Sequence, residues 1–245
     1  MSALLVPTCA ALGAIAGALV PRVAYRLSVD HSATPRSACA ICSWPFPPGL
    51  AGWVRISARC PGCRTRLGPP GWLTALIGAA ACAVLGWSLD GKPALVLVAF
   101  LAVAVLGVLL AAIDLACLRL PDLLVAGTGG VALALLGTAA IVSGDAGPLL
   151  RGLLAAAVLG GGYLLLALLP GANLGFGDVK LAAVLGLLLG WVGWLAVLLG
   201  AVLPHLINGP VALGLLLTNR AGRKTELPLG PALLAGALAA IAIAS

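Results

Sequence analysis

Long apolar segments follow one another along most of this chain and leave little polar sequence between them. Hydrophobic residues make up 62% of the 245 residues, and the mean hydropathy is +1.18. Runs such as Ala94–Ile113 and Val179–Gly190 are too apolar and too frequent to be core helices of a water-soluble domain of this size. Only helices and closed barrels span lipid, and the sequence lacks the alternating pattern of barrel strands. An all-α, polytopic membrane protein is therefore predicted.

About eight transmembrane helices are predicted, with Gly or Pro marking most of the breaks between them. The first apolar segment lacks the basic start of a signal peptide and is followed by many others, so we interpret it as a retained helix. The sequence divides into residues 1–70, with the first span and a polar loop, and residues 71–245, with the remaining bundle. The predicted spans are 3–20, 71–89, 93–113, 122–142, 148–169, 179–190, 192–217 and 228–244.

The basic residues are distributed unevenly around these spans and predict an orientation. The net charge is +7 with 14 Lys and Arg, and only Lys92 and Arg151 fall on the side opposite to the others. By the positive-inside rule the polar loop is cytoplasmic and both chain ends are outside. Nucleic-acid binding is not predicted, because the basic stretch has no groove-reading motif. The residues predicted to be cytoplasmic are Arg22, Arg26, Arg36, Arg55, Arg59, Arg64, Arg66, Arg119, Lys180, Arg220, Arg223 and Lys224.

Four cysteines in the polar loop have the spacing of a metal site. Cys39 and Cys42 form one Cys-x-x-Cys pair, Cys60 and Cys63 form a second, and 17 residues separate the pairs. This spacing is typical of a zinc site of four thiolates, which is closed and structural. Disulfides are the alternative, but the cytoplasm in which this loop is predicted to lie keeps thiols reduced. The remaining cysteines are interpreted as packing residues. They are Cys9, Cys82 and Cys117.

Two aspartates at the edges of apolar segments are the candidate catalytic residues. Asp114 directly follows one predicted span and Asp178 directly precedes another, and the predicted topology places both at the cytoplasmic face. A carboxylate next to the hydrocarbon of a membrane costs free energy, so its presence suggests a function. Taken singly, Asp114 could be a helix-end charge that reaches water, and Asp178 could be favoured by a helix dipole.

The surrounding residues favour a catalytic pair. Gly175 and Gly177 remove side chains on both sides of Phe176, which permits close approach of backbone or substrate. Two carboxyls that share one proton can activate a water and polarise a peptide carbonyl, as in aspartic proteases. Asp122 follows a proline at the start of a span and resembles an N-cap. His205 is interpreted as a packing or helix-bonding residue.

Two other functional classes are weighed against a protease. A proton- or ion-coupled transporter would also carry intramembrane acids, but those acids would lie near mid-span and often in internal repeats. The two aspartates lie at span edges, and we find no repeat. A non-catalytic scaffold that docks partners through the cysteine loop would leave both aspartates unused.

The ordered set of motifs resembles the prepilin peptidases, the type IV leader peptidases of the Gly-x-Gly-Asp intramembrane aspartic protease group. The resemblance covers nearly the whole chain, and it rests on the order of the motifs rather than on any single one. The segments that carry it are Pro21-Arg-Val-Ala-Tyr-Arg-Leu, the double Cys-x-x-Cys loop, Ile113-Asp114 through Leu120-Pro121-Asp122, Gly175-Phe-Gly-Asp178-Val-Lys180-Leu and Leu227-Pro-Leu-Gly-Pro.

The resemblance implies a catalytic role for Asp114 and Asp178, with Gly175, Gly177, Lys180 and Asp122 as supporting residues. It implies that residues 1–70 are the family's N-terminal domain and that residues 71–245 are the peptidase bundle. The implied substrates are type IV prepilins or pseudopilin precursors with basic leader peptides, cleaved at the cytoplasmic face of the bacterial plasma membrane during pilus assembly or protein secretion.

One stretch departs from the family. Many members also methylate the new N-terminus with S-adenosylmethionine, and the stretch after their second cysteine pair usually ends in an Arg-Tyr-Pro-x-Val-Glu-like sequence. Here it reads Leu67-Gly-Pro-Pro-Gly-Trp-Leu-Thr-Ala-Leu and contains no acid. This difference counts against S-adenosylmethionine as a cofactor.

Overall fold

The computed structural model describes residues 4–30, 33–170, 174–218 and 228–245, in which every regular element is a helix. Across these ranges no strand forms, and the extended segments make only two isolated bridges, Ala38 to Pro45 and Arg59 to Arg66. The prediction of an all-α fold is confirmed. The helices are α1 (Leu5–Leu27), α2 (Leu50–Trp53), α3 (Gly71–Ser88), α4 (Ala94–Cys117), α5 (Asp122–Ser143), α6 (Gly147–Ala167), α7 (Phe176–Val192), α8 (Trp194–Leu217) and α9 (Gly230–Ala244).

Eight long helices coincide with the eight predicted spans, and the short α2 lies in the polar loop. Six of the described helices are long and apolar enough to cross a membrane, namely α1, α3, α4, α5, α6 and α8. The other two long helices are shorter, since α7 has 17 residues and α9 has 15. Prolines precede α3, α4 and α5 directly, where a fixed φ and a missing N–H are tolerated.

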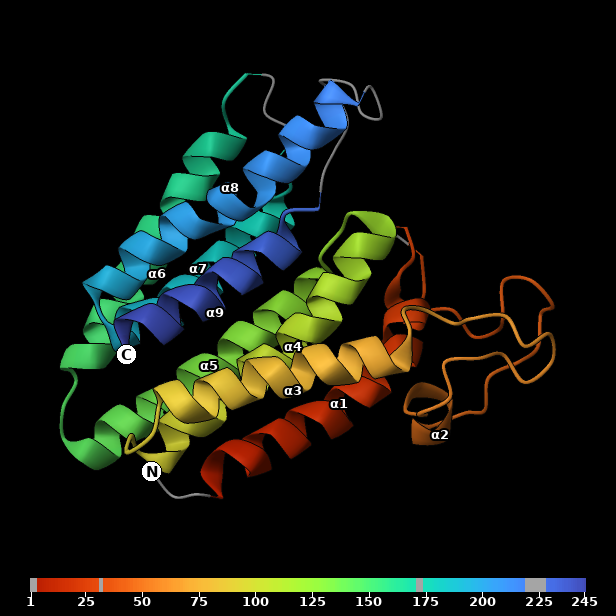
Figure 1. Ribbon diagram of the computed structural model, residues 1–245, viewed down its shortest axis with the longest axis horizontal. Helices are drawn as coiled ribbons and strands as arrows, with labels where there is room; N and C mark the ends of the chain where they lie inside the picture. Colours follow the sequence, from red (N-terminus) through yellow and green to blue (C-terminus); the bar gives the residue numbers. More distant parts are fainter. Residues whose placement is uncertain (1–3, 31–32, 171–173, 219–227) are drawn as a thin grey trace.

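The helices run along one another as a bundle (Figure 1). The closest neighbours are α1 with α3, α6 with α7, α8 with α9 and α4 with α5. The cysteine loop projects from one end of the bundle, and α4 ends and α7 begins toward that same end. α1 begins and α9 ends at the opposite end. Of the basic residues used to predict the orientation, Arg220, Arg223 and Lys224 lie outside the described residues, as does Leu227 of the last motif.

α1 continues through Pro21 to Leu27, seven residues beyond the predicted end of the first span. The helix therefore runs past the predicted end of the first span at residue 20, and the cysteine loop folds back over these last turns. A Cβ added to Gly68 would lie 2.4 Å from the carbonyl oxygen of Pro21, so the loop backbone touches the helix there. α1 also packs on α3 and α4. The division of the chain at residue 70 stays a prediction.

Glycines allow the closest helix pairs to approach. Gly13 and Gly17 of α1 face α3, where Gly78 faces back toward them. A Cβ on Gly13 would lie 2.1 Å from the carbonyl oxygen of Gly78, and a Cβ on Gly78 would lie 2.3 Å from that of Gly13. Small residues at such crossings bring backbones together where lipid offers no hydrophobic driving force. On the α6–α7 pair, a Cβ on Gly186 would lie 2.7 Å from the carbonyl oxygen of Ala155.

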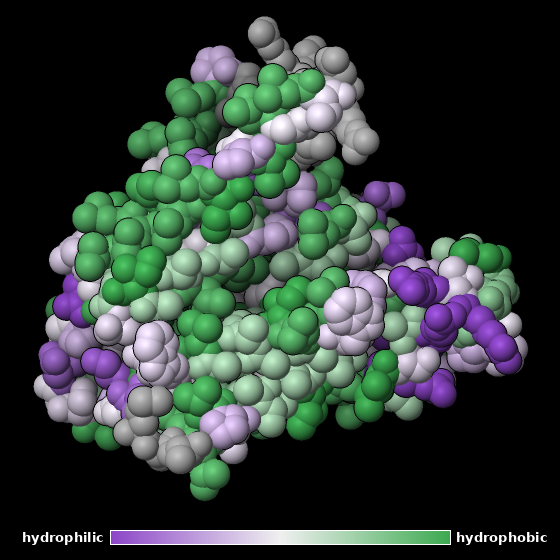
Figure 2. Space-filling view, in the orientation of Figure 1, coloured by the Kyte–Doolittle hydropathy of each residue, from purple (hydrophilic) through white to green (hydrophobic). Residues whose placement is uncertain are grey.

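The interior and much of the exterior of the bundle are apolar. The main core joins residues from α3 to α9, including Phe100, Leu136 and Leu181. Apolar side chains also cover much of the visible surface along the helices, while hydrophilic residues gather toward the ends of the bundle (Figure 2). Arg151 of α6 donates to the carbonyl oxygens of Gly190 and Trp191 at 2.6 and 2.7 Å. Its charge therefore stabilises the C-terminal end of α7.

The substitution Gly78→Ala should destabilise the bundle, because its methyl group would overlap the backbone of α1. Overpacking of this kind costs about 1–3 kcal/mol, and we expect a lower thermal unfolding midpoint in detergent. Gly130→Ala in α5 is the matched control, since a Cβ there meets nothing within 4 Å and alanine favours a helix. Equal midpoints for the two variants would contradict the close α1–α3 crossing.

Candidate active site and metal centre

Asp114 is buried near the end of α4 and is bonded to the start of α9. Its side chain is 4% exposed, and its Oδ2 accepts a hydrogen bond of 3.0 Å from the backbone N–H of Gly230. Leu118 follows the last residue of α4 and adopts a left-handed φ of 53°. Its backbone N–H donates to the backbone carbonyl of Asp114. A free N–H at the start of a helix carries partial positive charge. The structure therefore supplies this carboxyl with a donor from a distant segment.

Asp178 lies in the first turn of α7 and faces the end of α4. Within the described residues, its Oδ1 atom is buried and has no hydrogen-bond partner. A Cβ on Gly177 would lie 2.9 Å from Cβ of Leu120, so glycine is needed for α7 to approach the α4–α5 turn. A Cβ on Gly175 would only make an ordinary contact of 3.5 Å with Oδ2 of Asp178. Close packing of the backbone therefore accounts for the glycine at position 177 but not for the glycine at position 175.

One pocket of about 410 Å³ is lined by both aspartates. The same pocket includes all four predicted supporting residues, which come from α5, α7 and the turn before α7. An acid with an unpartnered oxygen and a second acid held by a backbone N–H can bind a water and a polar substrate group between them. The lining residues are Asp114, Leu118, Arg119, Leu120, Asp122, Gly175, Phe176, Gly177, Asp178 and Lys180.

Lys180 and Asp122 form an ion pair at the edge of this pocket. Lys180 Nζ lies 2.7 Å from Asp122 Oδ1, and both side chains are exposed. The interpretation of Asp122 as an N-cap was wrong, because Pro121 occupies the cap position of α5 and no side chain caps the helix. The carboxylate instead reaches across to α7. The pair links the start of α5 to α7, the helix that carries Asp178.

Some residues of this region were not assigned from the sequence. Gly230 was visible only as part of the Leu-Gly-Pro motif, with no sign that its N–H would reach Asp114. In the sequence analysis Arg119 served only to predict the membrane orientation. In the structure it lines the pocket and donates to the carbonyl of Val29 at 3.1 Å. Tyr163 of α6 has a buried hydroxyl without a partner among the described residues. His205 bonds to the carbonyl of Ala201 at 3.0 Å, in line with its interpretation as a helix-bonding residue.

The four cysteines of the polar loop converge on one point. Their Sγ atoms all lie within 4.8 Å of one another, with 3.8 Å between those of Cys39 and Cys63 and 3.5 Å between those of Cys42 and Cys60. Tetrahedral coordination with bonds of about 2.3 Å places sulfurs about 3.8 Å apart. All seven cysteines of the chain are free thiols. The loop can therefore hold a metal ion, whereas a disulfide pairing is not observed.

Each cysteine pair has the same local fold. The N–H of Cys39 donates to the carbonyl of Trp44, and the N–H of Cys60 donates to that of Thr65. Ser43 and Arg64 adopt left-handed φ values of 55° and 58° at equivalent positions. Hydrogen bonds from the hydroxyl and the backbone N–H of Thr65 lower the pKa of the Cys63 thiol to about 6, whereas desolvation and hydrogen bonds to the neighbouring thiols raise the pKa of Cys42 to about 12. A thiolate at neutral pH is the form that binds a metal.

A buried arginine supports the presence of a metal with four thiolates. Arg22 of α1 is fully buried, and its three guanidinium nitrogens have no hydrogen-bond partner in the described parts of the chain. The guanidinium lies 4.6 Å from the ring centroid of Phe46, which packs in one cluster with Cys39 and Cys60. Four thiolates around a divalent ion carry a net charge of about −2. That charge would compensate the buried guanidinium.

Comparison with known protein families gives a match to part of the chain. Residues 100–210 match the model of the type IV leader peptidase family, in agreement with the resemblance inferred from the motifs. This segment contains Asp114 and Asp178 and lies outside the cysteine loop. No curated protein and no solved structure matches the chain.

The purified protein should contain about one metal ion per chain, held by the four clustered thiols. Cys60→Ser should lose the ion, because one ligand is removed, while Cys117→Ser should keep it, because Cys117 lies on α4 and bonds to the carbonyl of Ile113. Elemental analysis measures both the amount and the identity of the metal. Metal near zero in the unmodified protein, or disulfides in place of titratable thiols, would overturn the assignment.

Proposed function

We propose that Asp114 and Asp178 together hydrolyse a peptide bond, in a chain whose residues 100–210 match the type IV leader peptidase family. The observation that carries this proposal is their common pocket. Two carboxyls from helices that are far apart in sequence line one cavity of about 410 Å³. One carboxyl is bonded to Gly230, and the other has an oxygen free to bind water or substrate.

The pair is expected to act as a dyad that holds one proton. Two neighbouring carboxyls in a poorly hydrated site do not both ionise readily, so the proton belongs to the pair rather than to one residue. The ionised carboxylate takes a proton from water, and the water oxygen attacks the carbonyl carbon of the substrate. The protonated carboxyl donates to the carbonyl oxygen. These steps give a tetrahedral intermediate. Its collapse breaks the C–N bond, and a carboxyl proton passes to the leaving amine.

The metal of the cysteine loop is proposed to be zinc with a structural role. Cys39, Cys42, Cys60 and Cys63 provide the four ligands of a closed tetrahedral site. Such a site stabilises the fold of the loop, because metal binding is coupled to its folding. The loop lies against the last turns of α1, where Gly68 touches Pro21 and Phe46 contacts Arg22. The metal would therefore hold the loop on the bundle.

The substrates are proposed to be prepilin or pseudopilin precursors with basic leader peptides. Cleavage would occur in the bacterial plasma membrane at its cytoplasmic face. The family resemblance and the distribution of basic residues support this location. The products would serve pilus assembly or protein secretion. The proposal covers cleavage alone, since the stretch after Cys63 lacks the acid found in methylating members.

Both carboxylates lie at helix ends, and this position favours hydrolysis over transport. Asp114 is in the last turn of α4, and Asp178 is in the first turn of α7. A transport path through the bundle would place acids near the middle of the membrane. A pocket at one end of the bundle suits a peptide that reaches the membrane from its aqueous side.

Asp114→Asn and Asp178→Asn should each lower cleavage by about a thousandfold or more, because neither residue can perform both roles of the dyad. The measurement is turnover of a purified precursor in detergent or liposomes, with folding checked by thermal unfolding. Asp145→Asn is the matched control, since Asp145 is exposed and bonds only locally to Gly147. Asp122→Asn should be milder than either dyad variant. Near-normal turnover of a dyad variant would refute the proposed pair.

The proposed orientation predicts where a protease can reach the intact protein. A specific cleavage site inserted next to Arg55 should be protected in sealed right-side-out vesicles, because the cysteine loop is cytoplasmic. The same insertion next to Asp145 should be cut. Inside-out vesicles provide the reciprocal measurement. Cleavage at Arg55 from the outside would place the loop and the aspartate pocket on the wrong side for a cytoplasmic peptidase.

A further inference from the structure

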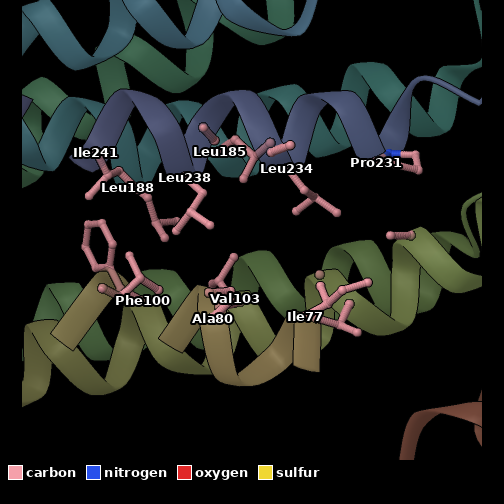
Figure 3. A pocket seen from close by; sticks show the side chains of 18 of the residues that line it. Ile77, Ala80, Phe100, Val103, Leu185, Leu188, Pro231, Leu234, Leu238 and Ile241 are labelled. Atoms are coloured by element: carbon pink, nitrogen blue, oxygen red, sulfur yellow. The ribbon is translucent and has the colours of Figure 1, made fainter. Parts of the chain in front are cut away.

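One segment of the cysteine loop carries apolar side chains in a setting unlike that of the bundle. Inside the bundle, apolar side chains of neighbouring helices face one another. Leu234 and Leu238 of α9, for example, point toward Val103 of α4 (Figure 3). The segment Leu50–Ile56, which contains α2, instead belongs to a polar loop and carries its apolar side chains on the outside.

Three apolar side chains of this segment face outward. The exposed fraction is 82% for Leu50, 43% for Val54 and 73% for Ile56. Trp53 packs on α1 instead, because the guanidinium of Arg26 lies 3.7 Å from its ring centroid. The segment is therefore attached to the bundle on one side and presents an apolar surface on the other. We call Leu50, Val54, Arg55 and Ile56 the loop patch.

The loop patch lies at the level where α3 enters the bundle. A Cβ on Gly71, the first residue of α3, would lie 3.7 Å from the carbonyl oxygen of Ile56. α3 is long and apolar enough to cross a membrane. Trp72 in its first turn is 70% exposed, and tryptophans at the ends of spans are typical of the boundary between headgroups and acyl chains. α2 also lies beside the end of α1 (Figure 1). A lipid surface therefore adjoins the loop patch.

The charge of the loop complements an anionic surface. Residues 33–70 contain five arginines and no acidic residue. Arg55 is exposed between Val54 and Ile56. A divalent ion with four thiolates would contribute a charge of about −2, which leaves the loop positive. Basic residues beside a membrane are attracted to anionic headgroups. The other exposed arginines of the loop are Arg59, Arg64 and Arg66.

We propose that the loop patch docks on a lipid surface that contains anionic headgroups. Leu50, Val54 and Ile56 enter the boundary between headgroups and acyl chains, as the apolar face of an interfacial segment does. Arg55 binds lipid phosphate, for which a guanidinium offers paired donors. This docking holds the cysteine loop against the bilayer at the end of the bundle. The inference depends on a membrane-spanning bundle and not on the proposed peptidase activity.

The same observations favour lipid over a peptide as the partner. A basic leader peptide, the proposed substrate, would be repelled by a loop with five arginines and no acid. Lipid, in contrast, already surrounds the helices on which the loop patch rests, so docking needs no further association. An apolar side chain that enters lipid also removes its exposed surface from water.

Photocrosslinking tests the docking in the full-length protein. A photoreactive phenylalanine analogue replaces Ile56, or Ser43 as the comparison position, since Ser43 is exposed in the first cysteine turn. The proteins are placed in vesicles of phosphatidylethanolamine and phosphatidylglycerol, and bound metal is measured to show that the loop is folded. We expect at least about fivefold more crosslinks to lipid from position 56 than from position 43. Equal lipid crosslinking at the two positions, or crosslinks from position 56 to protein alone, would overturn the proposal.

The lipid charge is tested by changing the vesicle and then the protein. Vesicles of phosphatidylcholine should give fewer lipid crosslinks from position 56, and equal yields in both vesicles would contradict an anionic surface. Arg55→Gln should lower the yield in anionic vesicles by about fivefold, the equivalent of about 1 kcal/mol for one basic residue near the surface. Arg55→Lys is the matched control and should keep most of the yield, because it keeps the charge. Equal losses for both variants would refute the charge contact.

Salt provides a measurement that needs no further substitution. At about 0.5 M salt the attraction between exposed arginines and headgroups is screened, so the yield from position 56 in anionic vesicles should fall toward that in phosphatidylcholine. The yield from position 43 should not change. A yield from position 56 that is independent of salt would show that charge does not hold the loop patch on the membrane and would overturn the proposal.

Discussion

The hydrogen bond between the N–H of Gly230 and the buried carboxyl of Asp114 is the contact on which the site depends. A carboxyl at the end of an apolar helix needs a donor, and a net contribution of about 1.5–3 kcal/mol is typical for a bond to a charged group. A Cβ on Gly230 would lie 2.8 Å from Oδ2 of Asp114, so this contact requires glycine. By joining the start of α9 to the end of α4, it holds the carboxyl of Asp114, which lines the aspartate pocket.

The cysteine loop is connected to the bundle through the end of α1. Arg22 is buried without a hydrogen-bond partner among the described residues. Burial of its charge lowers the free energy of unfolding unless a negative charge lies nearby. A metal bound by the four thiolates would supply such a charge and would account for an arginine in the last turns of α1. Arg26 lies 3.7 Å from the ring centroid of Trp53 in α2 and adds a second contact between helix and loop.

The sequence by itself determined the helical class, the number and order of the long helices, the spacing of the four cysteines and the choice of Asp114 and Asp178. These follow from local properties, namely hydropathy, Gly and Pro breaks and motif spacing. It failed at Pro21, where the helix continues under the cysteine loop, and at Asp122, which pairs with Lys180 instead of capping α5. Only the tertiary structure decided these points, together with the bond from Gly230 to Asp114. The physical reason is that each depends on which segments pack side by side, and a backbone N–H that reaches a distant carboxyl leaves no pattern in the sequence.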